Sequence, residues 1–280
     1  MGSPALRFAK YEGLGNDFIV LDARESRPEE PGELAETICD RHFGAGADGL
    51  ILLTQGEDAD LGMEIFNSDG SPASMCGNAI RCLAAMAHRH GLVTAQSGEI
   101  VFSTPSGLRS TRLLGASPWW VEVDMGRPSA WGEGAGELSP VNEIQITLGE
   151  QVVPAFLVSM GNPHCVVLAP NLGDSWLAWG KHLEKTMNGE EGTNVEFVEV
   201  HDTDNLGVKV WERGAGATLA CGTGACAALV AMASIGKCHR AAHVNLPGGA
   251  LQVEWTREGR VLMRGPAREL YRGEWSPDPN

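Results

Sequence analysis

Two cysteines of this chain stand in matching surroundings, and a pair of thiols can carry protons to and from a carbon atom. Cys76 lies in MCGNAI at residues 75–80, and Cys221 lies in ACGTGA at residues 220–225. Each cysteine is followed by a glycine, a short polar residue and a run of small or apolar residues, and another glycine stands 15 residues after each. The two cysteines are 145 residues apart, about half of the 280-residue chain. The pattern predicts two similar lobes that each contribute one cysteine to a shared cleft.

A cysteine placed directly before a helix faces the first amide groups of that helix and the positive end of its dipole. This position lowers the pKa of a thiol, so we expect both thiols to ionise readily. The same amide groups suit a carboxylate. One thiolate could then remove the proton next to the carboxylate while the opposite thiol delivers a proton to the other face. The amide groups expected to bind the carboxylate are those of Gly77, Asn78, Gly222 and Thr223.

The elements that must position these cysteines follow from the hydrophobic pattern. Helices are predicted at residues 31–43, after Cys76, around residues 172–183 and at residues 222–235. Strands are predicted at residues 6–10, 18–21, 49–53, 63–67, 98–104, 107–114 and 119–125, and then at 144–147, 155–160, 165–168, 195–200, 208–211, 242–244, 250–255 and 260–263. Residues 126–140 are rich in glycine, proline and serine and are interpreted as the crossing between two lobes.

The second half repeats the order of the first away from the cysteines as well. Gly15-Asn16 matches Gly161-Asn162 at an offset of 146 residues, and Asn67 matches Glu212 at an offset of 145. The sequence therefore predicts an α+β fold of two pseudo-symmetric lobes, each a strand-rich sheet or barrel wrapped around a central helix. The expected domains are residues 1–125 with Cys76, residues 126–267 with Cys221, and a terminal segment 268–280 that returns to the first lobe.

Composition narrows the partners and the compartment. A formal net charge of −15 argues against nucleic acid and against anionic membrane surfaces. No apolar run reaches 18 residues, and the N-terminus lacks an apolar signal segment, so no membrane association is expected. Seven cysteines without a CxxC pair fit neither a disulfide framework nor a zinc site. The predicted setting is a reducing cytoplasm.

Several other patterns do not indicate a cofactor. Residues 44–49 match the GxGxxG dinucleotide pattern, but they follow a predicted helix and precede a strand, which is the reverse of the required order. The chain has no GxxxxGK[ST] loop, and no lysine stands in a context that indicates a pyridoxal cofactor. We therefore expect neither a metal nor a cofactor. The cysteines without matching flanks are interpreted as packing residues, namely Cys39, Cys82, Cys165, Cys226 and Cys238.

The chain resembles the diaminopimelate epimerases over nearly its whole length. The resemblance rests on YEGLGNDF at residues 11–18, RHFGAGADG at 41–49, FNSDG at 66–70, MCGNAIRC at 75–82, MGNPH at 160–164, GTNV at 192–195, WERG at 211–214 and ACGTGA at 220–225. It implies a cofactor-independent interconversion of LL- and meso-diaminopimelate, on the way to lysine and peptidoglycan.

The resemblance also implies residue roles. Cys76 and Cys221 match the acid/base pair, and His164 and Glu212 match residues that tune the thiols. The positions that match substrate contacts are Asn16, Asn67, Asn162, Asn194, Glu212 and Arg213. Arg213 is expected to clamp the distal carboxylate, because arginine binds carboxylates with two hydrogen bonds. Tyr271 matches a tyrosine at a dimer interface, so a homodimer is expected.

Two positions depart from the family pattern. Gly49 stands where some members carry a glutamine that contacts the substrate, and glycine cannot supply that contact. Ala217 stands where an acidic residue is frequent, which leaves open the hydrogen bonding of the loop before Cys221.

Three alternatives remain open at this point. A racemase of proline or hydroxyproline would share the fold, but Glu212 and Arg213 suit a substrate with a charged distal end. A redox or thiol-exchange protein could use the same cysteines as a disulfide. A non-catalytic binding module is the third.

Overall fold

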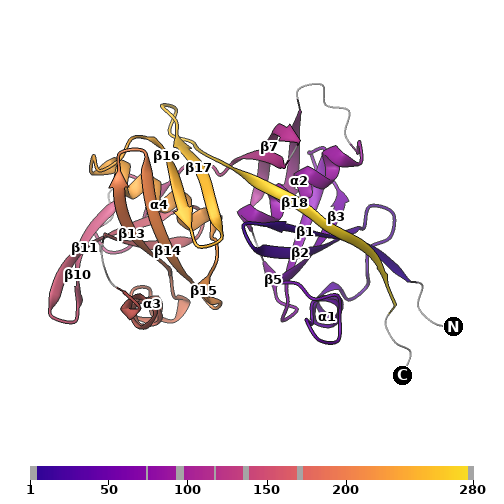
Figure 1. The fold of residues 1–280 in the computed structure, drawn as a ribbon, viewed down its shortest axis with the longest axis horizontal. Coiled ribbons are helices and arrows are strands. Elements are labelled where there is room, and N and C mark those ends of the chain that lie inside the picture. Colours follow the sequence, from indigo (N-terminus) through magenta and orange to yellow (C-terminus); the bar gives the residue numbers. More distant parts are fainter. Residues whose placement is uncertain are drawn as a thin grey trace. The chain divides into compact units, whose positions relative to one another are not determined.

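The computed structural model describes residues 5–73, 75–92, 98–116, 118–134, 139–168 and 173–276 (Figure 1). The chain divides into two compact units. The first unit comprises Met1–Val123 together with Gly265–Asn280, and the second comprises Asp124–Arg264. Within the described residues, no helix is long and apolar enough to cross a membrane.

The first unit is a strand-rich layer that surrounds one buried helix. Its strands are β1 (Leu6–Gly13), β2 (Asn16–Asp22), β3 (Gly49–Gln55), β4 (Leu61–Asn67), β5 (Pro72–Ala73), β6 (Glu99–Thr104), β7 (Gly107–Ala116) and β8 (Trp119–Asp124), and its helices are α1 (Pro31–Ile38) and α2 (Gly77–Arg89). Every residue of α2 from Gly77 to Ala87 is buried. Contacts from β1, β2, β3 and β7 account for this burial.

The second unit has the same plan. Its strands are β9 (Ser129–Ala130), β10 (Asn142–Leu148), β11 (Gln151–Ser159), β12 (Pro163–Leu168), β13 (Asn194–Asp202), β14 (Asn205–Glu212), β15 (Gly216–Thr218), β16 (Ala241–Leu246) and β17 (Gly249–Trp255). Its helices are α3 (Ser175–Thr186), the short η1 (Gly189–Glu191) and α4 (Gly222–Ser234). Helix α4 is buried from Gly222 to Met232, as expected for a helix that is apolar on nearly every side. It packs against β11, β12, β13, β14, β16 and β17.

The strand pairing repeats between the units. Strand β2 runs parallel to β3, and β12 runs parallel to β13. The next pairs, β3 with β4 and β13 with β14, are antiparallel. The crossovers through the buried helices then give parallel pairs again, β4 with β6 and β14 with β16. The α+β fold with two pseudo-symmetric lobes around central helices is therefore confirmed.

One long strand, β18 (Val261–Trp275), contributes to both units. Its first residues pair with β17 from Val261 to Arg264. Its later residues pair antiparallel with β1, from Arg268 opposite Glu12 to Trp275 opposite Leu6. The strand expected at residues 260–263 is thus only the beginning of a 15-residue strand.

Two of the predicted helices were also wrong in extent. The helix expected at residues 31–43 ends at Ile38, because Asp40 accepts hydrogen bonds from the amides of His42 and Phe43 and turns the chain. The helix expected around 172–183 spans Ser175–Thr186, and residue 172 lies outside the described part of the chain. The stretch 126–140 contains the short strand β9, which pairs with the end of β11.

Candidate functional site

Cys76 lies at the N-terminal end of α2, in extended conformation with φ −140° and ψ 117°. Its sulfur is half-buried and lies 3.9 Å from Nδ2 of Asn16, which donates a long hydrogen bond to it. The first amide groups of α2, from Gly77 and Asn78, precede the first hydrogen bond of the helix, which Ile80 donates to the Cys76 carbonyl. The thiol and the helix end therefore lie together, as the sequence predicts.

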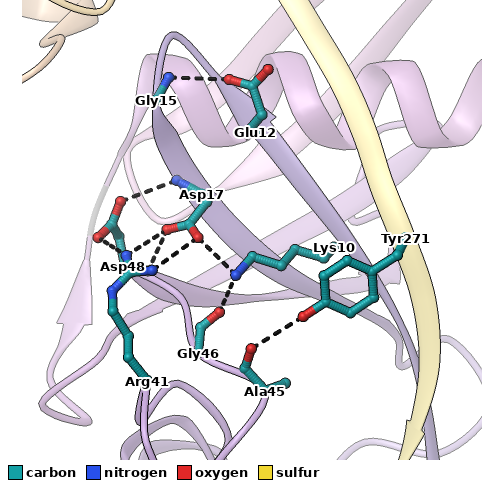
Figure 2. A network of polar contacts seen from close by, with 9 residues as sticks. All are labelled: Lys10, Glu12, Gly15, Asp17, Arg41, Ala45, Gly46, Asp48 and Tyr271. Carbon is teal, nitrogen blue, oxygen red and sulfur yellow. Dashed lines mark hydrogen bonds and ion pairs between the residues drawn. The ribbon is translucent and has the colours of Figure 1, made fainter.

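A charged network surrounds Asp17, the residue that follows Asn16 in the chain (Figure 2). The Asp17 carboxylate accepts a hydrogen bond from Arg41 at 2.7 Å. It also forms an ion pair with Lys10 at 2.8 Å. Arg41 also pairs with Asp48 at 2.7 Å, and the Asp17 amide donates to Asp48 Oδ2 at 3.0 Å. Lys10 in turn donates to the Gly46 carbonyl. The network fixes the turn that carries Asn16 to the loop that follows α1.

The pKa values of the two carboxylates in this network, Asp17 and Asp48, shift in opposite directions. Burial alone would raise the pKa of Asp17, but hydrogen bonds from Arg41 and Lys10 more than offset it and lower that pKa to about 2. Burial, reinforced by the neighbouring charge of Asp17, raises the pKa of Asp48.

Asn67, the second predicted substrate contact of this unit, lies next to a residue that Asp48 binds. The backbone carbonyl of Asp48 accepts a hydrogen bond from the amide of Ser68, which follows Asn67. Asn67 itself donates to Ser71 Oγ at 2.9 Å.

Cys221 occupies the equivalent position at the start of α4, with φ −118° and ψ 117°. Its sulfur is buried and accepts a hydrogen bond from the amide of Gly224 at 3.4 Å. The hydroxyl of Thr223 lies at the same distance, 3.4 Å, from the sulfur. Thr223 therefore lies against the thiol through its hydroxyl, and the Gly224 amide, which was not among the predicted groups, is a second neighbour.

The prediction that this helix position lowers the thiol pKa was wrong for Cys221. Burial, together with the negative charges of Glu212 and Glu196, raises the pKa of Cys221 well above the ordinary range. The hydrogen bonds from Thr223 and Gly224 act in the opposite direction but are smaller. Cys221 therefore holds its proton at neutral pH.

Glu212 lies at the end of β14 and contacts Cys221. Burial raises the pKa of Glu212, although hydrogen bonds with Thr218 and Cys221 partly offset this effect. The Thr218 hydroxyl donates to Glu212 Oε1 at 2.5 Å. Thr218 directly follows Ala217, where family members often carry an acidic residue. In this chain the Thr218 hydroxyl is thus a hydrogen-bond donor to the Glu212 carboxylate.

The remaining predicted contacts of the second unit lie on neighbouring strands. Asn194, at the start of β13, donates to the Pro163 carbonyl at 3.0 Å and accepts from the Arg213 amide at 3.0 Å. The Arg213 side chain is exposed and donates to the Glu191 carbonyl at 3.3 Å. Asn194 thus positions the backbone of Arg213 by using both ends of its amide.

Hydrogen bonds connect His164 through Asn162 to Thr223, beside Cys221. The Nε2 atom of His164 lies 3.0 Å from Oδ1 of Asn162, and the Asn162 amide donates to Thr223 Oγ1 at 3.4 Å. Its Nδ1 lies 2.7 Å from the Glu196 carboxylate. Glu196 was missed in the sequence, because an acidic residue between apolar residues of the run NVEFVEV resembles a surface position of a strand, as Glu199 of the same run is.

Two further residues have contacts that the sequence does not reveal. Arg81, one turn into α2, is fully buried and donates to the carbonyls of Pro266 and Gly77, both at 3.2 Å. Tyr271 is 44% exposed, and its hydroxyl donates to the Ala45 carbonyl at 3.1 Å. Its ring lies over Lys10 of the charged network, with Nζ 5.9 Å from the ring centroid (Figure 2).

Sequence comparison gives one family. The family model described as "Diaminopimelate epimerase" matches residues 8–131 and 156–270. A diaminopimelate epimerase of Desulforudis audaxviator is 47% identical over 277 residues, which cover 96% of this chain and 99% of the relative. One from Moorella thermoacetica is 43% identical over 281 residues, covering 98% of this chain and all of the relative (100%).

Solved structures share the fold at low sequence identity. A probable proline racemase from Agrobacterium radiobacter, with bound carbonate, superposes with a TM-score of 0.74 at 15% identity and covers 98% of this chain and 94% of its own. A hydroxyproline epimerase from Agrobacterium vitis, with bound trans-4-hydroxy-L-proline, also gives a TM-score of 0.74 at 15% identity, covering 100% of this chain and 95% of its own. These likenesses establish the fold alone.

Proposed function

The chain belongs to the diaminopimelate epimerase family, and from that premise we propose that Cys76 and Cys221 are the acid and base that interconvert LL- and meso-2,6-diaminopimelate without a cofactor. The observation that carries the proposal is the matched placement of the two thiols. Each lies at the N-terminal end of a buried central helix, in nearly the same extended conformation. Family membership supports an isomerase that acts on diaminopimelate, a precursor of lysine.

The helix ends suit the reacting carboxylate of the substrate. Each offers the first amide groups of a helix and the positive end of a helix dipole, which favour bound anions. Removal of the α-proton moves charge onto this carboxylate, and amide donors already in place stabilise that charge as it develops. The proposed donors are the amides of Gly77, Asn78, Gly222 and Thr223, with Asn16 beside Cys76.

The raised pKa of Cys221 supports an order of proton transfers. In the resting protein Cys221 carries a proton and serves as the acid. Cys76 then serves as the base for the isomer whose α-hydrogen faces it. The opposite isomer requires the reverse distribution of protons, in which Cys221 must give up its proton. The carboxylate of Glu212 is hydrogen-bonded to this thiol.

The distal end of diaminopimelate needs polar groups that a small cyclic imino acid does not. Arg213 is exposed and its backbone is fixed by Asn194, so its guanidinium is proposed to clamp the distal carboxylate. Asn67 and Asn194 are proposed to contribute amide hydrogen bonds, and Glu212 can accept one from an ammonium group.

His164 is proposed to act on the thiols through its neighbours. We also propose a cytoplasmic homodimer in which the exposed Tyr271 lies at the interface.

An epimerisation assay tests the function. The reduced protein is incubated with LL-diaminopimelate in the presence of a chelator and without added cofactor, and the meso isomer is measured by chiral chromatography. Conversion of LL-diaminopimelate, with L-proline and trans-4-hydroxy-L-proline unchanged, is the expected result. Racemisation of proline alone would replace the proposal by the racemase alternative, and no turnover of any of the three by the reduced protein would favour a thiol-exchange protein.

A further inference from the structure

Glu196 is a buried carboxylate that the proposed proton transfer does not use. It lies on β13, and both Glu196 and His164 have an exposed fraction of 0%. Glu196 Oε1 lies 2.7 Å from His164 Nδ1, while Oε2 has no hydrogen-bond partner among the described residues. A carboxylate without full hydrogen bonding is costly to bury. Its presence beside the Cys221 helix therefore calls for a physical role.

A chain of hydrogen bonds leads from this carboxylate to the sulfur of Cys221. The first link after the Glu196–His164 contact is from Nε2 of His164 to Oδ1 of Asn162, at 3.0 Å. The Nδ2 group of Asn162 then donates to Thr223 Oγ1 at 3.4 Å. The Thr223 hydroxyl lies 3.4 Å from Cys221 Sγ. All members belong to the second unit.

The same carboxylate also packs against the first turn of α4. A Cβ atom at Gly224 would lie 2.5 Å from Glu196 Oε1 and 3.2 Å from its Cγ and Cδ. A side chain at position 224 would thus displace Glu196, and the Gly224 amide is one of the donors to Cys221. The Glu196 carboxylate is therefore connected to the Cys221 thiol in two ways, through the chain of hydrogen bonds and through its packing against Gly224.

The first unit provides an internal comparison. Phe18 and Ile51 occupy the positions that His164 and Glu196 hold 146 and 145 residues later, on the equivalent parallel strand pair. The buried acid and imidazole of the second unit therefore replace two apolar side chains in the first. The repeated fold does not need this pair, so the fold alone does not explain it.

We propose that Glu196 is a positioning residue for the Cys221 thiol: its buried carboxylate fixes the ring of His164 and, through Asn162, the hydroxyl of Thr223 beside the sulfur, and its charge acts on that sulfur. This inference rests on the acid/base role proposed for Cys221. It makes the two thiols chemically unequal, since only Cys221 has this acid behind it. The titratable groups that face Cys221 are Glu212 from β14 and Glu196 from β13, with His164 from β12 bonded to Glu196.

Removing the Glu196 charge should make Cys221 ionise at lower pH, because that charge helps to raise the pKa of Cys221. The substitution Glu196→Gln keeps the shape and an acceptor for His164 while it removes the charge. The matched control is Glu199→Gln on the same strand, where the side chain is 52% exposed. Both changes are made in a Cys76→Ser background, and the rate of iodoacetamide alkylation at Cys221 is followed by mass spectrometry as a function of pH.

The expected result is a shift of the Cys221 alkylation profile by about one pH unit to lower pH in Glu196→Gln, or about tenfold more thiolate at a given pH. Glu199→Gln should leave the profile in place. Equal profiles for the two variants would overturn the proposal. The readout needs no turnover, so it stays separate from a failure of the proposed epimerase function.

A second measurement uses the unaltered protein and does not depend on the variant folding. Nitrogen-15 spectra of histidine-labelled protein report which ring nitrogen carries the proton. His164 is expected to be protonated at Nδ1, where it donates to Glu196. A His164 ring protonated only at Nε2 would show that it does not donate to a charged Glu196, and would overturn the proposal.

Discussion

Two cysteines with the same local sequence pattern have different surroundings. At the residue scale, the pattern of a cysteine before a glycine and a helix predicts both thiols correctly as helix-end residues. It predicts the wrong direction for the pKa of Cys221, because burial and the negative charges of Glu212 and Glu196 outweigh the effect of the helix end. The helix dipole is a local effect that sequence reveals, whereas burial and neighbouring charge depend on the folded chain.

Arg213 gives the first prediction at this scale. Arg213→Ala should lower kcat/KM for diaminopimelate by roughly 10- to 100-fold, since a hydrogen bond to a charged group contributes about 1.5–3 kcal/mol. The control is Arg257→Ala, another exposed arginine of the second unit, in the turn between β17 and β18. Steady-state kinetics with both variants test the assignment. A similar loss in the two variants, or none in Arg213→Ala, would remove Arg213 from the substrate site.

At the scale of elements, ion pairs hold the turn that carries Asn16 to the loop that follows α1. The helix after Cys76 and the strand pair around Gly15 were predictable from periodicity and glycine placement. The loop from Asp40 to Asp48 was not, because its shape depends on ion pairs with Asp17 on β2. The predicted helix at residues 31–43 was too long because Asp40 accepts hydrogen bonds from the amides of His42 and Phe43 and turns the chain.

The loop leads to the second prediction. Arg41→Ala releases Asp17 and Asp48 from their shared partner, so Asn16 should lose its fixed place beside Cys76 and kcat should fall severalfold. In an Asn16→Ala background the same change should have little further effect, because residues that act through one another are not additive. Arg24→Ala, which breaks an ion pair of 2.7 Å with Asp22 in the same unit, serves as control. Full additivity of Arg41→Ala and Asn16→Ala would contradict the argument.

At the scale of the whole molecule, the doubled pattern of the sequence predicted the repeat of the fold. The offsets of 145 and 146 residues reappear in the parallel pairs, where Phe18 lies opposite Gly49 and His164 opposite Asn194. The 15-residue strand β18 was not predicted, because its apolar alternation fades after Ala267 and its pairing partner β1 lies at the other end of the chain. Sequence patterns reveal local periodicity, but not which distant strand completes a sheet.

Buried thiols give the molecule a predictable response to alkaline pH. Burial raises the pKa of Cys238 to about 11 and that of Cys39 to about 12, from an ordinary value of 9.0. A group whose pKa is raised by folding stabilises the protein fully below its unfolded pKa, and that stability is lost as pH rises toward the folded pKa. The free energy of unfolding should therefore fall above about pH 9, with each such thiol contributing up to about 1.4 kcal/mol per pH unit.

Urea unfolding of the reduced protein at several alkaline pH values measures this effect. The slope of stability against pH should be smaller in Cys238→Ala than in the unaltered chain, once both are compared over the same range. A free energy of unfolding that rises above pH 9 would be inconsistent with buried neutral thiols.

The central claim is that the two thiols serve opposite faces of one carbon atom, and elimination from a β-halogenated diaminopimelate analogue tests it most directly. Elimination needs only the base, so a single Cys76→Ser or Cys221→Ser variant should still release halide, although neither should epimerise at more than a trace. A serine hydroxyl is a much poorer base than a thiolate, so each variant should react only with the stereoisomer whose α-hydrogen faces its remaining cysteine. The account predicts opposite stereoisomer preferences for the two variants. Elimination from the same stereoisomer by both, or epimerisation at the unaltered rate by either, would contradict it.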